Sequence, residues 1–511
     1  MATKPHWNVL AVPPFSALAL LLLYGCAGSD RTAETGDTSA TGRSRQERAI
    51  AARSRPRESV AGVDGNENRV TPSARPADSP DRRVDVGYNS GPLDDGSPRE
   101  FPRFRRFASR RIDESRVAAA GIRKLTGKHI ALYTDLPPGT EVDELPGVFD
   151  QAFPQWCDYF AVDAGSDEVW RVNCFLIKDR EPFTNAELLP DDLPPFTTGF
   201  QRRDTIWIYE QPTAYLRRHL LLHEGTHAFM RNWCGGDGSP WYFEGTAELL
   251  GTHRWQAGKL TLGHFPRNRQ QVPQWGRINT MKSETAAGRA MTMREIVNLP
   301  AWPDTHDVGY AWAWGAAAFL EGHPRYRRHV RRMSEHIGRR DFSKRLTDAL
   351  EDQWPRLSEQ WQLFVFNLEY GYDVERAAVK YETAELAGTI ATVAADRGWQ
   401  SSGIRLQAGM SYRIAASGRY QVAREPKIWW CEPGGVTIRY YQGRPLGVLL
   451  GAFSRDDVPQ APITPLASPM VIGLGHTISP ERSGTLYLRI NESAAELGDN
   501  AGTLTVEITL E

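Results

Sequence analysis

Cysteine is scarce in this sequence, and so is an excess of either charge. The 511 residues include 5 cysteines, and no two of them form a C-x-x-C pair. A cysteine-based zinc site is therefore not expected, and the scattered spacing predicts no disulfide framework. The formal net charge is −1. Because nucleic-acid binding needs a concentrated basic face, we expect no nucleic-acid partner.

The N-terminus lacks an apolar run long enough to cross a bilayer. Residues 15–24 are apolar, but a membrane-spanning helix takes about 20 such residues. The next residues complete Leu-Tyr-Gly-Cys, which resembles a bacterial lipoprotein signal in which Cys26 becomes the lipidated first residue. The alternative is an ordinary secretory signal cut nearby. Both predict an extracytoplasmic protein, and the resemblance implies anchoring to the lipid bilayer through Cys26.

Aromatic residues are almost missing from about residue 29 to residue 99, which is rich in Arg, Asp, Ser, Gly, Thr and Pro. Such a segment cannot bury enough apolar surface to offset its ordering entropy. We therefore expect a signal peptide at 1–26, a disordered linker at 27–100, a first folded domain at 101–378 and a second at 379–511.

The two predicted folded domains differ in their hydrophobic periodicity. The first should be mainly helical with a small N-terminal sheet. Its expected strands are 129–136, 171–179 and 205–209, and its expected helices are 145–159 (kinked or split at Pro154), 213–233, one from Pro240, 310–320, 326–337, 342–351 and 357–368. The second should be an all-β sandwich, with strands that include 411–415, 436–441, 446–450, 485–490 and 503–510. The predicted fold class is α+β.

The helix expected at 213–233 contains the motif His223-Glu224-Gly225-Thr226-His227. Two histidines four residues apart project from one face of a helix, where both can bind one metal ion. Glu224 lies beside them, where it can take a proton from water. His219 lies four residues before His223, but we expect it to be a solvent or core histidine. The motif predicts a zinc-dependent hydrolase.

A second motif follows, Trp-Tyr-Phe-Glu-Gly-Thr-Ala-Glu at 241–248. Together the two motifs resemble the gluzincin branch of the zinc metallopeptidases, in the peptidase-MA-like families, and this implies a zincin-like fold. The resemblance implies that Glu244 is the third zinc ligand and that Glu224 is the general base. It also implies that Glu248 orients His223 from behind; the alternative is that Glu248 is a solvated carboxylate. A metzincin site is excluded, because its glycine and third histidine are missing.

Gluzincins often use a downstream tyrosine or histidine to stabilise the oxyanion, and Tyr310 is the candidate here. Alternatively, Tyr310 only packs beside Trp312 and Trp314. The resemblance further implies a peptide or protein substrate, which could pair with the edge of the strand at 205–209.

The last 120 or so residues resemble the bacterial PA-I type galactophilic lectin, a small galactose-binding-like β-sandwich. The resemblance rests mainly on the loop with Asn491-Glu492 and Asp499-Asn500. It implies that Glu492, Asp499 and Asn500 are calcium ligands and that the domain binds a glycan. The alternative is a spacer whose acidic loop is solvated.

Two functions are therefore compatible with the sequence. The first is a zinc metallopeptidase, secreted and lipid-anchored, with a carbohydrate-binding-like module. The second is a noncatalytic, surface-anchored binding protein that is lectin- or adhesin-like and has a degenerate peptidase domain.

Overall fold

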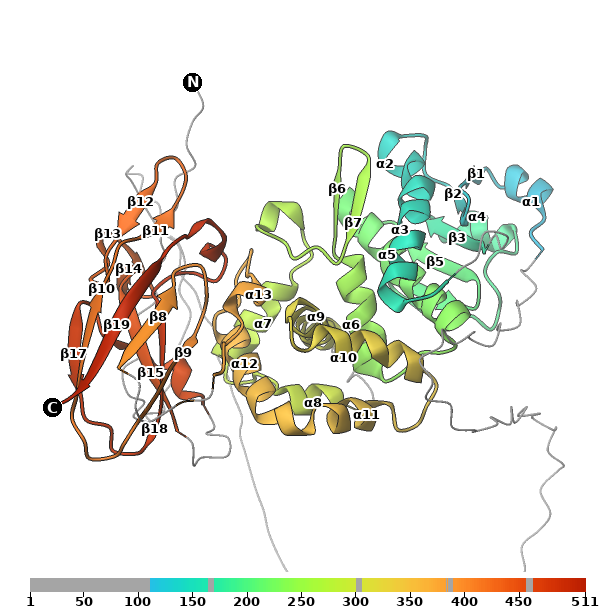
Figure 1. Ribbon diagram of the computed structural model, residues 1–511. Helices are drawn as coiled ribbons and strands as arrows, with labels where there is room; N and C mark the ends of the chain where they lie inside the picture. Colours follow the sequence, from blue (N-terminus) through green and yellow to red (C-terminus); the bar gives the residue numbers. More distant parts are fainter. Residues whose placement is uncertain (1–110, 164–169, 300–305, 383, 385–388, 456–462) are drawn as a thin grey trace, which may run out of the picture. The chain divides into compact units, whose positions relative to one another are not determined.

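The computed structural model describes residues 111–163, 170–299, 306–382, 384, 389–455 and 463–511. The described chain begins with helix α1 and a five-stranded sheet in the order β1-β2-β3-β5-β4 (Figure 1). β2, β3 and β5 run parallel, while β1 and β4 are antiparallel to their neighbours. The elements are α1 Glu114–Ala119, β1 Arg123–Thr126, β2 Ile130–Thr134, β3 Val172–Ile177, β4 Gly199–Arg202 and β5 Thr205–Tyr209.

Two long helices pack against each other next to this sheet. α3 (Leu145–Phe160) lies between β2 and β3 in the chain, and α5 (Ala214–Phe229) follows β5. At their close approach stands Gly225, where a Cβ would lie 2.7 Å from Phe149 and 2.8 Å from Trp156. A side chain at this position would overlap both rings in a close-packed interior. Glycine in the middle of the His-Glu motif thus lets α5 approach α3.

The remainder of this half is helical and surrounds α6 (Pro240–Gly251), which contacts both α5 and α9 (His306–Gly322). Buried tryptophans dominate its core and include Trp156, Trp241, Trp312, Trp314 and Trp361. The other helices and one hairpin are α2 Thr140–Asp143, α4 Arg180–Asn185, η1 Met230–Cys234, β6 His253–Gln256, β7 Lys259–Leu262, η2 Arg269–Gln271, α7 Arg277–Ala286, α8 Met293–Val297, α10 Arg327–Arg332, η3 Met333–His336, α11 Phe342–Ala349, η4 Glu351–Gln353, α12 Trp354–Phe366 and α13 Val374–Ala377.

After α13 the described chain is almost entirely β-structure. Two four-stranded sheets, β17-β10-β19-β8 and β16-β15-β18-β9, share one buried apolar cluster. β10 and β19 alternate buried and exposed residues, as strands with one covered face do. The elements are β8 Ile390–Ala394, β9 Gln400–Leu406, β10 Tyr412–Ser417, β11 Tyr420–Ala423, β12 Trp429–Cys431, β13 Val436–Tyr441, β14 Arg444–Leu446, β15 Leu449–Arg455, η5 Pro465–Ala467, β16 Met470–Val471, β17 Gly475–Ile478, β18 Gly484–Ile490, η6 Leu497–Asp499 and β19 Thr503–Leu510.

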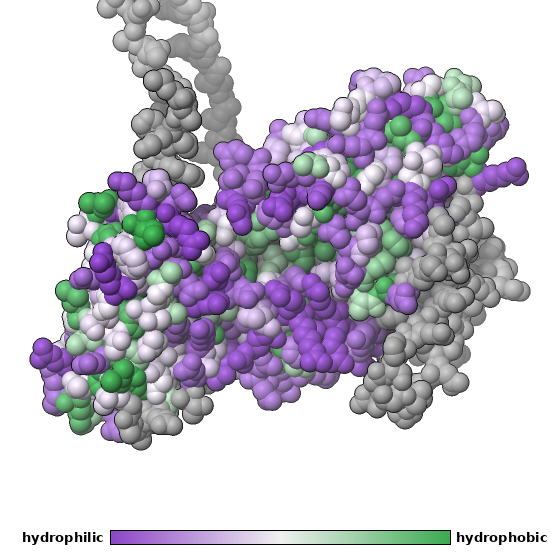
Figure 2. All heavy atoms as spheres, turned by 45° about the horizontal axis from the view of Figure 1, so that its top comes forward, coloured by the Kyte–Doolittle hydropathy of each residue, from purple (hydrophilic) through white to green (hydrophobic). Residues whose placement is uncertain are grey.

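The surface differs between the helical and the β-stranded parts. Figure 2 shows mostly hydrophilic side chains on the visible face of the helical part and several apolar patches on the sandwich. Exposed large apolar side chains of the sandwich include Ile428, Trp430 and Ile438.

The α+β class predicted from the sequence is confirmed at this coarse level. Of the two expected effects of Pro154, a split helix is wrong, because α3 continues through this residue. Pro154 lies on the exposed side of α3, and the buried apolar side chains on both sides of it hold the helix together. The helix expected to reach residue 233 changes after Phe229 into the π-helical turn η1.

The predicted signal peptide, the linker and the lipidation residue Cys26 lie outside the described residues. Of the helices in the described part of the chain, none combines the length and apolarity needed to cross a membrane.

Candidate metal centre

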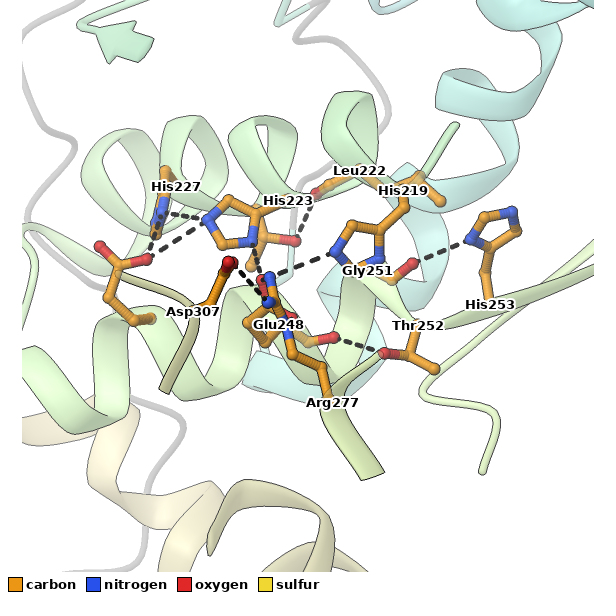
Figure 3. Close-up of polar contacts among 12 residues, drawn as sticks. His219, Leu222, His223, His227, Glu248, Gly251, Thr252, His253, Arg277 and Asp307 are labelled. Carbon is orange, nitrogen blue, oxygen red and sulfur yellow. Dashed lines mark hydrogen bonds and ion pairs between the residues drawn. The ribbon is translucent and has the colours of Figure 1, made fainter. Parts of the chain in front are cut away.

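Helix α5 presents three histidines on one face. His219, His223 and His227 follow at four-residue steps, and all three are buried. The helix begins at a defined point, because the Thr213 side chain accepts a hydrogen bond from the Leu216 N–H at 3.1 Å. Figure 3 shows the three imidazoles in a row along the helix.

Two of these histidines meet Glu244, which comes from the second turn of α6. The Nε2 atoms of His223 and His227 are 3.0 Å apart, and Glu244 Oε2 lies 3.3 Å from the first and 3.4 Å from the second. Ligands about 2.0–2.1 Å from a tetrahedral zinc ion are roughly 3.3 Å apart from one another. Glu244 Oε2 is buried, and no hydrogen-bond donor among the described residues satisfies it. The three atoms therefore fit one metal ion.

The charges around this triad favour a cation. Burial lowers the pKa of His223, but the facing carboxylates of Glu244 and Glu248 outweigh burial and raise the pKa to about 10. Burial raises the pKa of Glu244, yet the two imidazoles hold it well below the usual range. The raised pKa of His223 shows that the two carboxylates stabilise positive charge at this buried position. The same carboxylates would stabilise a bound divalent cation.

Glu224 lies beside the triad on the same helix, in contact with strand β4. Its side chain is 6 % exposed, and burial raises its pKa to about 7. A Cβ built on Gly199 of β4 would lie 2.5 Å from Glu224 Oε1. The backbone of β4 therefore passes directly next to this carboxylate, which has a pKa suited to proton transfer near neutral pH.

Glu248 lies behind His223 and is 2 % exposed. The alternative that it is a solvated carboxylate is therefore wrong, because Glu248 is on the face of α6 that packs against α5. Its Oε1 atom lies 3.4 Å from His223 Nδ1 and 3.6 Å from His219 Nε2. Arg277 donates one hydrogen bond to each oxygen of Glu248, both at 3.0 Å. Arg277, on the separate helix α7, was missed in the sequence because no motif or spacing connects it to α6.

Tyr310, from the first turns of α9, faces the site. Its ring centroid is 5.9 Å from that of His223, edge to face, and the Arg277 guanidinium lies 5.4 Å over its ring. Burial, followed by the nearby carboxylates, raises the pKa of Tyr310, so its hydroxyl keeps its proton. Trp312 and Trp314 are fully buried and pack against Trp361 and Trp275, respectively. The structure thus brings Tyr310 to the histidines.

The edge strand next to the strand at 205–209 is β4, and β1 forms the opposite edge of the sheet. The strand at 205–209 is β5, which pairs with β3 on one side and with β4 on the other. The expectation that its own edge accepts a peptide is therefore wrong, because the sequence did not reveal the short strand β4. In antiparallel strands, hydrogen-bonded residue pairs alternate with pairs that are not hydrogen-bonded to each other. Tyr209 N donates to Thr198 O, so Thr198 and Tyr209 form a hydrogen-bonded pair, and the next pair, Gly199 with Ile208, does not. This alternation directs the N–H and C=O groups of Gly199 and Gln201 away from β5.

Arg231 fixes β4 to the helix that carries the site. Its Nη1 donates to the Gln201 carbonyl at 3.0 Å and to the Gln201 side-chain oxygen at 2.6 Å. The same guanidinium pairs with Asp237 and lies 4.9 Å over the ring of Phe243, which stacks on His227. Arg231 and Phe243 were also missed in the sequence, although both lie close to the two motifs.

The acidic loop of the sandwich is partly buried. Glu492 is fully buried, and burial raises its pKa to about 8. Its Oε1 accepts a hydrogen bond from Ser493 N, and Asn500 Nδ2 donates to the Ala395 carbonyl. Three oxygens of these residues, Glu492 Oε2, Asp499 Oδ1 and Asn500 Oδ1, are buried without a hydrogen-bond donor among the described residues, while Asp499 Oδ2 accepts from Arg424 N. The alternative of a solvated loop is therefore wrong for Glu492 and Asn500, which are both buried.

Comparisons with known proteins leave the function open. No family model matches this chain, and no curated protein matches it. Among solved structures, one match is described as "EclA N-terminal domain; PllA-like lectin". It is 22% identical, covers 24% of this chain and 97% of that chain, and has a TM-score of 0.19. At that TM-score, the likeness carries no argument for fold or function.

Proposed function

We propose that this chain is a zinc-dependent metallopeptidase of the gluzincin type, with a zincin-like catalytic domain. The observation that carries the proposal is the triangle of His223 Nε2, His227 Nε2 and Glu244 Oε2, with sides of 3.0, 3.3 and 3.4 Å. Two imidazoles and one carboxylate are a ligand set typical of catalytic zinc, which leaves a position for water. When bound, the ion would act as a Lewis acid and lower the pKa of water.

Glu224 is the proposed general base. It accepts a proton from the attacking water while the water oxygen bonds to the carbonyl carbon of the scissile peptide bond. The same carboxyl group then returns the proton to the amine nitrogen as the carbon–nitrogen bond breaks. Its burial and its pKa of about 7 support both steps near neutral pH. Tyr310 donates a hydrogen bond to the carbonyl oxygen as negative charge develops there.

Strand β4 is the proposed docking edge for the substrate. An extended peptide can add to an exposed strand through main-chain hydrogen bonds. The Gln201 carbonyl already accepts from Arg231, so Gly199 is the position in β4 that is most open to pairing. Gly199 also lies against Glu224, so a peptide bound there passes the general base. Because Gly199 has no side chain, β4 can lie close to Glu224 and can also accept a peptide at this position.

The test is hydrolysis of a mixed peptide library by purified protein reconstituted with zinc. Wild type should cleave peptides and bind about one zinc per chain. Glu224→Gln should bind zinc equally well and lose cleavage, whereas a His223→Ala, His227→Ala double variant should lose both. If wild type binds zinc but cleaves nothing in the library, the noncatalytic binding protein becomes the better account.

A second proposed function concerns the sandwich: calcium-dependent binding of a glycan, with Glu492, Asp499 and Asn500 as ligands. It is supported by three buried oxygen atoms that lack hydrogen-bond donors among the described residues. A glycan array with and without calcium tests this function, and the absence of any calcium-dependent signal would refute it.

Extracytoplasmic location and lipid anchoring through Cys26 also remain proposals, tested by radiolabelled lipid incorporation into wild type and Cys26→Ser.

A further inference from the structure

Arg277 forms an ion pair with both carboxylate oxygens of Glu248, next to the proposed metal centre. It is the first residue of α7, and its side chain is 16% exposed. Nε donates to Glu248 Oε2 and Nη2 donates to Glu248 Oε1, both at 3.0 Å. This two-point arrangement, which only arginine can make, fixes the plane of the carboxylate. A third nitrogen, Nη1, pairs with Asp307 at 3.3 Å.

Glu248 in turn faces the ring nitrogen of His223 that is not part of the ligand triangle. Glu248 Oε1 lies 3.4 Å from His223 Nδ1 (Figure 3). The other ring nitrogen, His223 Nε2, faces His227 and Glu244. A carboxylate that accepts the Nδ1 proton of a histidine fixes its tautomer and ring orientation, and leaves Nε2 free to bind a metal ion. The orientation of His223 therefore depends on where Glu248 is held.

A second possible metal site overlaps the first. Ligand atoms of His219, His223 and Glu248 all lie within 4.8 Å of one another, as do those of His223, His227 and Glu244. The two groups share His223, whose Nε2 faces the first group and whose Nδ1 faces the second. The guanidinium of Arg277 touches both oxygens of Glu248, so a cation bound by the second group would be repelled at close range. The local charges therefore favour the first group over the second.

We propose that Arg277 is the positioning residue of the metal centre: it holds Glu248 as the partner of His223 Nδ1 and so directs the ion to His223, His227 and Glu244. The inference rests on the proposed function only in that these three residues must bind a metal ion. Without Arg277, the buried carboxylate of Glu248 would lose its two-point partner and keep only the longer contacts to the imidazoles of His219 and His223. The carboxylate would then be free to rotate, and His223 would lose its orientation.

The test measures Co²⁺ affinity by competition with a chelator, together with the visible spectrum of the bound ion. Arg277→Met should weaken binding by about 10- to 100-fold, as loss of an outer-shell partner does. Arg277→Lys keeps the charge but not the two-point contact, so it should fall between Arg277→Met and wild type. Arg217 also pairs with both oxygens of a glutamate, Glu210, and is buried, so Arg217→Met is the matched control.

A double-variant comparison covers the case in which Arg277→Met does not fold. In a Glu248→Gln background there is no carboxylate for Arg277 to position, so adding Arg277→Met should change Co²⁺ affinity by less than about 3-fold. The inference is overturned if Arg277→Met binds like wild type or if Arg217→Met weakens binding equally. It is also overturned if Arg277→Met costs as much affinity in the Glu248→Gln background as in the wild-type background. Failure of wild type itself to bind Co²⁺ or Zn²⁺ would instead refute the proposed function.

Discussion

Replacement of Gly199 by alanine is the most informative single perturbation of the proposed site. The new Cβ would lie 2.5 Å from Glu224 Oε1, 2.9 Å from Leu220 Cδ1 and 3.0 Å from Glu224 Cδ. Ordinary contacts are about 3.5 Å, so the Glu224 carboxylate has to move by roughly 1 Å. A displacement of that size can cost about 100-fold in rate. We therefore expect Gly199→Ala to lower kcat by about two orders of magnitude.

The assay measures steady-state peptide hydrolysis and zinc affinity side by side, because the substitution should reduce hydrolysis without weakening zinc binding. The Cβ faces Glu224 and not the ligand atoms, so zinc affinity should stay within about 3-fold of wild type. Gly147→Ala is the matched control, since a Cβ there meets nothing within 4 Å. Unchanged hydrolysis in Gly199→Ala would refute the placement of the general base against β4, and so would an equal loss in Gly147→Ala.

Three further predictions concern other groups. Glu224 must be ionised to accept a proton, so kcat/KM should fall with decreasing pH. The midpoint should lie at or below pH 7, because a bound cation lowers the pKa of Glu224 from about 7. A profile that is flat from pH 5 to 8 would contradict this role. Tyr310→Phe should reduce kcat by about 100-fold with a smaller change in KM, and a loss confined to KM would assign the hydroxyl to substrate binding. The pKa of Glu492 rises on folding from 4.5 to about 8, so without calcium this group should make the sandwich less stable as pH rises from 5 to 8. Calcium should remove that loss in thermal melts of wild type but have no effect on Glu492→Gln; equal melts of the two proteins would count against calcium binding there.

The sequence predicted the parts of the site that lie within one helix or between adjacent helices. The four-residue step from His223 to His227 follows from helix geometry, and the Ser239-Pro240 start places Glu244 on the next helix. Ser239 is at the N-cap position, although its side chain makes no capping hydrogen bond. Short-range spacing was enough for these residues.

Contacts between distant segments could not be predicted in this way. Arg277 reaches Glu248 from another helix, and no local pattern distinguishes it from the many surface arginines of this chain. Strand β4 has four residues and no apolar alternation, so its pairing with β5 decides its existence. The sequence predicts that His219 is a solvent or core histidine; it is buried and faces Glu248, which accepts hydrogen bonds from Arg277.

The most direct test of the central claim is a zinc-edge anomalous difference map from crystals of the zinc-loaded protein. The account predicts one peak per chain, about 2.0–2.2 Å from His223 Nε2, His227 Nε2 and Glu244 Oε2. A peak beside His219, His223 Nδ1 and Glu248, or no peak near α5 in protein that was saturated with zinc, would contradict it.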